Sequence, residues 1–93
     1  MTRKEILYVQ MMEKAGEITQ EVSKCLSFGT SQTFPAKEGS NESRLMQEII
    51  DLLAIIELCQ FEGFVPAWPV DVRERMDAKK AKVAMTIEQS TWK

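Results

Sequence analysis

The run Leu45–Cys59 is the most apolar stretch of the chain, yet it contains Glu48 and Asp51. In an α-helix, a spacing of three places both carboxylates on one face, about 60° apart around the axis. Apolar side chains flank that face on both sides, so we expect the pair to point into a core. Two carboxylates there repel each other and lose hydration, which is costly unless a cation or strong donors compensate. The alternative is a solvated stripe on an amphipathic helix, for which this run leaves little room.

Composition limits the classes of protein to which the chain can belong. Its 93 residues suit a single domain, residues 1–93, and 44% of them are hydrophobic and 28% charged, as in ordinary folded proteins. The net charge of −2 argues against nucleic-acid binding, because that needs a basic surface. The absence of histidine excludes histidine-based triads and histidine metal ligands. The two cysteines, Cys25 and Cys59, lie in apolar helical contexts and are expected to be buried thiols in a reducing compartment.

The apolar spacing predicts an all-α fold with helices over about 3–27, 41–62 and 71–87. Thr2 and Glu5 have the spacing of a capping box, Ser40 or Asn41 is expected to cap the second helix, and Asp71 the third. Residues 29–40 form a loop that is long for so small a domain. The first helix has apolar residues at steps of three and four: Ile6, Leu7, Met11, Ala15, Ile18, Val22 and Leu26.

The second helix is apolar nearly all round, so more than one neighbour must cover it. Two other helices from one small chain do not readily supply that cover. We therefore expect a core four-helix bundle that is completed by oligomerisation, as a homodimer or a homotetramer. The apolar run is too short and too interrupted by charge to span a membrane, and we expect a cytoplasmic protein without a membrane partner.

The first helix carries carboxylates that can meet those of the second. Glu17 and Glu21 lie at the boundary of its apolar face, near the middle of the helix. If the two helices pack antiparallel, these side chains converge with Glu48 and Asp51. Several carboxylate oxygens together with water suit Mg²⁺ or Mn²⁺, which prefer oxygen ligands.

The two segments that carry these carboxylates resemble the motifs of a known protein family. Residues 12–18 read MEKAGEI and residues 47–53 read QEIIDLL, which is similar to the ExxE and ExxD motifs of the MazG-like all-α nucleoside triphosphate pyrophosphohydrolases. The resemblance extends over about residues 5–62 and is closest to the small phage-encoded MazG-like proteins, which share the Ser23-Lys24 pair and the pattern from Asn41 to Asp51. It implies a MazG-like helical bundle in the cytoplasm, the host's if the chain is phage-encoded.

The resemblance also implies an activity: hydrolysis of a nucleoside triphosphate to the monophosphate and pyrophosphate, with Mg²⁺ (or Mn²⁺) as cofactor. Carried over by position, Glu48 and Asp51 match the second motif and Glu17 matches the second Glu of ExxE. These three are the expected catalytic and metal-binding residues, with Glu21 as the fourth carboxylate. The first Glu of ExxE is absent, because Lys14 stands there.

Lys14 leaves two interpretations open. It lies about 60° from Glu17 toward the apolar face, so it is expected to point at the site. In one interpretation, another carboxylate supplies the missing ligand, metal still binds and the chain is an enzyme, which we prefer. In the other, the ammonium takes the place of the cation and leaves a non-catalytic helical binding or assembly protein, since an ammonium cannot activate water as a divalent ion does.

Substrate-binding residues are harder to assign from the sequence. Lys24 lies one to two helical turns beyond Glu17, and Lys79 and Lys82 belong to a basic surface of the third helix; each can meet a phosphate or can be a solvated lysine. Trp68 and Phe34 are candidates for stacking on a base, although Trp68 lies between two prolines and also suits a packing role.

Overall fold

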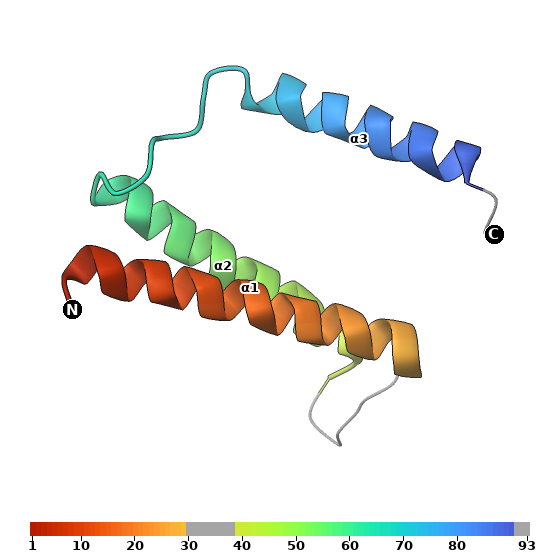
Figure 1. The fold of residues 1–93 in the computed structure, drawn as a ribbon, viewed down its shortest axis with the longest axis horizontal. Coiled ribbons are helices and arrows are strands. Elements are labelled where there is room, and N and C mark those ends of the chain that lie inside the picture. Colours follow the sequence, from red (N-terminus) through yellow and green to blue (C-terminus); the bar gives the residue numbers. More distant parts are fainter. Residues whose placement is uncertain (30–38, 91–93) are drawn as a thin grey trace.

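The computed structural model of the chain, described over residues 1–29 and 39–90, consists of three helices (Figure 1). They are α1 (Arg3–Phe28), α2 (Asn41–Phe61) and α3 (Val72–Gln89), and the described residues contain no strand. The all-α prediction is confirmed, and each helix begins and ends within two residues of its expected bounds. Phe34 and most of the predicted 29–40 loop lie outside the described residues.

Local capping sets where the helices begin and end. The Thr2 side chain accepts a hydrogen bond from the Glu5 backbone N–H (3.1 Å), and the Glu5 carboxylate accepts one from the Thr2 N–H (2.9 Å), which completes the capping box. Helix α1 ends at Phe28 and is capped by Gly29, whose φ of 93° is readily adopted only by glycine. Ser40 caps α2 through its hydroxyl, whereas Asp71 precedes α3 without a side-chain cap and pairs with Arg75 instead (3.1 Å).

Helices α1 and α2 pack antiparallel, side by side, as a hairpin (Figure 1). Polar contacts fix both ends of this hairpin. At one end Arg3 pairs with Glu62 (2.7 Å), and at the other the Asn41 side chain donates a hydrogen bond to the Gly29 carbonyl (2.9 Å). Asn41 and Cys59 are fully buried, and Cys59 is a free thiol, as is the partly exposed Cys25. These contacts set the register that brings the acidic residues of the two helices together.

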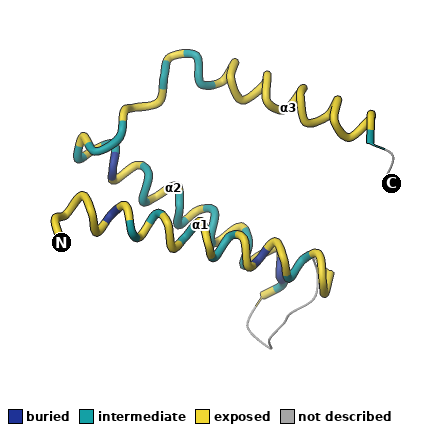
Figure 2. Tube along the Cα trace, viewed as in Figure 1, coloured by how far each residue is buried: buried dark blue, intermediate teal, exposed yellow. Residues whose placement is uncertain are grey.

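Helix α3 lies apart from the hairpin, as Figures 1 and 2 show, and none of its residues is buried. The connector before it is nonetheless fixed to the hairpin. The Tyr8 hydroxyl donates to the Phe64 carbonyl (2.8 Å), and the Gln60 amide donates to the Pro66 carbonyl (3.2 Å). The connector therefore sets the direction in which α3 leaves the hairpin.

Much apolar surface stays exposed in the single chain (Figure 2). Among the described residues, Leu7 and Cys59 are the buried apolar side chains, whereas Leu26 is 84% and Phe61 87% exposed. The radius of gyration is 16.4 Å, against about 12 Å for a compact domain of this length. Helical spacing thus identified the apolar faces, but several of the residues on them are not covered within this chain. In its described part the chain has no helix that meets the length and hydropathy needed to cross a membrane.

Candidate functional site

One lysine lies at the centre of a cluster of carboxylates between α1 and α2. The Lys14 Nζ atom is 2.9 Å from Glu17 Oε2, 3.4 Å from Asp51 Oδ2 and 3.5 Å from Glu48 Oε2. Lys14 and Glu17 come from α1, and Glu48 and Asp51 come from α2. The structure therefore brings together the three carboxylates that the sequence singled out, and it places Lys14 among them.

The helical register explains how each side chain reaches the cluster. Lys14 and Glu17 are three residues apart on α1, and Glu48 and Asp51 are three apart on α2, so each pair projects from one face. The antiparallel packing of the hairpin turns these two faces toward each other. Glu48 is the most enclosed of the three carboxylates, with 18% of its side chain exposed against 44% for Glu17. Within the part of the chain that the structure describes, its Oε2 atom is buried without a hydrogen-bond partner and forms an ion pair with Lys14.

The Glu17 and Glu48 carboxylates lie close together, and their pKa values shift in opposite directions. A hydrogen bond with Glu17, together with burial, raises the pKa of Glu48. The same hydrogen bond and the Lys14 ammonium lower the pKa of Glu17. The hydrogen bond from Lys14 to Glu17 raises the pKa of Lys14, so the lysine stays charged. The two directions mean that Glu48 takes up a proton before Glu17 does as the pH falls, because adjacent carboxylates resist double ionisation.

The donor chemistry of this cluster suits a hard divalent cation, since it offers carboxylate oxygens from two rigid helices. In the present arrangement, however, the cation that the carboxylates contact is the Lys14 ammonium. Within residues 1–29 and 39–90, no three or more acidic or cysteine side chains are grouped as a metal site. Lys14 and a divalent ion are thus alternatives for the same position. A metal ion would need the lysine side chain to leave before the carboxylates could close on it.

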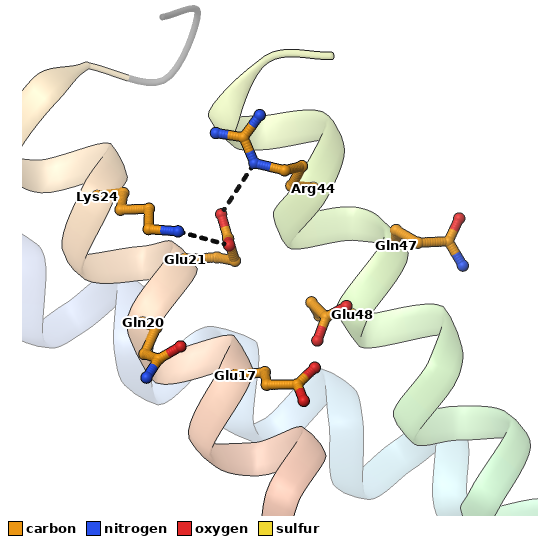
Figure 3. A pocket seen from close by; sticks show the side chains of 7 residues that line it. All are labelled: Glu17, Gln20, Glu21, Lys24, Arg44, Gln47 and Glu48. Atoms are coloured by element: carbon orange, nitrogen blue, oxygen red, sulfur yellow. Dashed lines mark hydrogen bonds and ion pairs between the residues drawn. The ribbon is translucent and has the colours of Figure 1, made fainter. Parts of the chain in front are cut away.

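A cavity of about 330 Å³ adjoins the cluster along the hairpin (Figure 3). Glu17 and Glu48 point toward one another on one side of it, and Glu21 extends from α1 toward two cations. Lys24 Nζ is 3.2 Å from Glu21 Oε1, and Arg44 Nε is 3.6 Å from Glu21 Oε2. The cavity is lined by polar and charged residues: Glu17, Gln20, Glu21, Lys24, Arg44, Gln47 and Glu48.

Glu21 has different charge partners from those of the other three carboxylates. It is buried, and the ion pairs described for it are with Lys24 and Arg44 rather than with Lys14. It lines the same cavity as Glu17 and Glu48. The hairpin therefore has two adjacent charged groups: three carboxylates around one cation, and two cations around one carboxylate.

Arg44 is a site residue that the sequence reasoning missed. It donates a hydrogen bond to the Gly39 carbonyl (2.9 Å) and contacts the buried Asn41 side chain, so the start of α2 holds it in place. A signal was present in the sequence, because Arg44 lies four residues before Glu48 and therefore on nearly the same face of the helix. Gln47 was also missed; its amide donates to Asp51 Oδ1 (2.8 Å) and helps to orient that carboxylate.

Of the remaining candidates, one lines the cavity and the others lie elsewhere in the described part of the chain. Lys24 lines the cavity, as its position beyond Glu17 suggested. Lys79 and Lys82 are exposed on α3 and do not line the cavity. Trp68 borders a separate apolar hollow of about 240 Å³ with Leu53, Val72 and Met76.

Comparison of the chain with protein-family models, with curated proteins and with solved structures finds no match. The resemblance to the MazG-like family therefore depends on the acidic motifs and the segments around them.

Proposed function

We propose that the chain is a metal-dependent nucleoside triphosphate pyrophosphohydrolase of the MazG-like type, which cleaves an NTP or dNTP to the monophosphate and pyrophosphate. The observation that carries the proposal is the convergence of Glu17, Glu48 and Asp51 from two helices beside a polar cavity that Lys24 and Arg44 also line. Carboxylates beside cations in one cavity suit a ligand that brings both a divalent cation and phosphate oxygens.

Each residue has a role in this proposal. Glu17, Glu48 and Asp51 hold Mg²⁺ (or Mn²⁺), with Glu21 as the nearest further carboxylate. When bound, the ion neutralises phosphate charge and lowers the pKa of a water molecule. Lys24 and Arg44 face the phosphate oxygens from the other end of the cavity. Gln47 orients the Asp51 carboxylate through its hydrogen bond.

A second candidate function is favoured by Lys14. Its ammonium contacts all three carboxylates and supplies the positive charge that the cluster needs. With Lys14 retained there, the chain is a non-catalytic helical binding or assembly protein of the MazG-like fold, because an ammonium does not activate water as a divalent ion does. The two candidates differ in whether a metal ion displaces Lys14.

Pyrophosphate release separates the two candidates. The wild-type chain is assayed on a panel of NTPs and dNTPs with Mg²⁺ and with Mn²⁺, and the enzyme proposal expects metal-dependent turnover. Glu48→Gln should abolish that turnover, whereas Glu42→Gln, an exposed change on the same helix, should preserve it. Turnover that is absent from the wild type and present in Lys14→Glu favours the second candidate. Turnover absent from both would overturn the enzyme proposal.

We also propose that the chain functions as a homo-oligomer, a dimer or a tetramer, in the cytoplasm. The exposed apolar surface of the single chain supports the assembly. The free thiols of Cys25 and Cys59 suit a reducing compartment.

A further inference from the structure

Helix α3 has one apolar stripe that the described part of its own chain leaves mostly uncovered. Its first two positions, Val72 and Met76, border a hollow with Leu53 and Trp68, but the hollow is not filled. Val72, Met76, Val83 and Ile87 lie within about 60° of one another around the helix, and Lys79 lies in the same stripe. Met76, Val83 and Ile87 are all exposed, and α3 stands away from the hairpin (Figures 1 and 2). A helix of this kind is marginal by itself, because most helical stability in proteins comes from packing an apolar face.

Helix α2 has a second uncovered stripe with the same spacing. Its five positions follow at steps of four, three, four and four residues, and all are exposed: Met46, Ile50, Leu53, Glu57 and Phe61. The five positions of the α3 stripe follow at the same steps: Val72, Met76, Lys79, Val83 and Ile87. Two stripes of equal length and equal spacing can pack against each other along their whole length.

The two stripes are also complementary in charge. The α2 stripe has one acidic residue, Glu57, and the α3 stripe has one basic residue, Lys79. When the stripes are aligned end to end, the central positions Leu53 and Lys79 meet whichever way the helices run. Glu57 then lies about one helical turn, roughly 6 Å, along the axis from Lys79, within reach of a lysine side chain.

A second copy of the chain fits this surface better than the chain's own α3 does. The connector is held to the hairpin by the Tyr8–Phe64 and Gln60–Pro66 hydrogen bonds and contains Pro66 and Pro69, so it resists a change in the direction of α3. Helix α1 is also uncovered on its outer side, where Met12 and Leu26 are exposed. One short helix cannot cover the outer faces of both α1 and α2.

The accessible area is large enough for a stable dimer. The chain exposes 7366 Å², whereas a compact monomer of 10.6 kDa exposes about 5500 Å². The difference exceeds the roughly 800 Å² that each partner contributes to a standard interface. We propose that two copies form a dimer by reciprocal exchange of α3, with the α3 stripe of each copy packed on the α2 stripe of the other. The inference deepens the homo-oligomer proposal and is independent of the enzymatic one.

A matched pair of substitutions on α3 tests which face is used. Val83→Glu places a carboxylate within the stripe, whereas Met85→Glu places one about 160° away on the same helix, and both positions are exposed. By sedimentation equilibrium, Val83→Glu should raise the dimer dissociation constant about 100-fold or more, because a carboxylate would lose its hydration in an apolar interface. Met85→Glu should change it less than about threefold. Equal effects of the two substitutions would overturn the proposal.

Mixing two charge variants tests whether α3 is exchanged between copies. Glu57→Lys and Lys79→Glu each create like charges in a homodimer, but a heterodimer of one chain of each restores opposite charges at both contacts. Native mass spectrometry of the mixture should give about nine-tenths heterodimer, because like-charge repulsion penalises both homodimers. If α3 packs on its own chain, mixing gives at most the random half. Random mixing would overturn the exchange of α3, although the chain would still be a dimer. A monomeric wild type would overturn both the exchange and the dimer.

Discussion

The α1–α2 hairpin and helix α3 use charge in different ways. In the hairpin, Lys14 pairs with three carboxylates on two helices, and the participating side chains are between 18% and 44% exposed. On α3, Asp77 pairs with Arg73 and Lys80 within one helix, and all three side chains are more than half exposed. Ion pairs within one exposed helix contribute little, because water and salt screen them. Ion pairs therefore help to hold the hairpin together, whereas the stability of α3 depends on what packs against its apolar stripe.

The buried polar contact at the end of the hairpin should give the largest effect on stability. Asn41 is fully buried, donates to the Gly29 carbonyl and contacts Arg44. Asn41→Leu removes the donor and leaves that carbonyl unpaired, so we expect a loss of about 2–3 kcal/mol in the free energy of unfolding. Urea unfolding followed by circular dichroism measures it. The exposed neighbouring change Glu42→Gln is the control, and a similar small shift for both would show that Asn41 does not hold the hairpin.

The central lysine should give the next largest effect. Lys14→Met leaves Glu17, Glu48 and Asp51 without their shared cation, so the melting temperature should fall in the absence of divalent ions. Mg²⁺ or Mn²⁺ should restore much of the loss, because the vacated position is then open to a metal ion. Scanning calorimetry with and without each ion measures both effects. A variant as stable as the wild type, with no response to either ion, would contradict the role assigned to Lys14.

The coupled carboxylates predict how stability depends on pH. Glu48 has a raised pKa, so its contribution is present at low pH and is lost as the pH rises through that pKa. Glu17 has a lowered pKa, so its contribution is present above its ordinary value and is lost as the pH falls. The two contributions oppose each other across the acidic range. Glu48→Gln removes the contribution of Glu48, which stabilises the wild type at low pH, and keeps an amide donor to Glu17. The stability of the variant should therefore fall more steeply than that of the wild type on acidification.

Thermal melting of both proteins between about pH 3.5 and 6 measures this difference in slope. Parallel profiles would show that the two carboxylates titrate independently. The same coupling predicts that binding of Mg²⁺ or Mn²⁺ weakens as the pH falls, since a proton on Glu48 competes with the ion for the carboxylate oxygens. Calorimetric titration at two pH values tests that second consequence.

Local features were predictable from the sequence, and choices that depend on packing were not. The Thr2–Glu5 capping box is set within one turn, so the start of α1 could be read directly from the sequence. The meeting of Glu17 with Glu48 followed from helical geometry once antiparallel packing was assumed. Helical geometry also pointed Lys14 at the site, but it could not say which carboxylates the ammonium would join.

Arg44 and α3 show why the remaining features could not be predicted. Arg44 contributes to the cavity because α1 crosses α2 in a register that brings Glu21 within 3.6 Å, and that register is fixed by contacts far apart in the sequence. Helical periodicity identified the third helix, but periodicity indicates which face is apolar and says nothing of what covers it. The separation of α3 from the hairpin depends on the hydrogen bonds of the connector, which are tertiary contacts.

The smallest effect on the melting temperature is expected for the exposed ion pairs of Asp77 on α3. Asp77→Asn removes both ion pairs with Arg73 and Lys80, nearly as many as Lys14→Met removes from the hairpin. Asp77 is 58% exposed and lies away from the stripe of α3, so the melting temperature should change by less than about 1 °C in the absence of divalent ions. If Asp77→Asn instead destabilises the chain as much as Lys14→Met does, the stability of the chain depends more on the number of ion pairs than on how far they are shielded from water. The distinction between the two regions would then fail, because exposed pairs within one helix would stabilise as strongly as screened pairs between two.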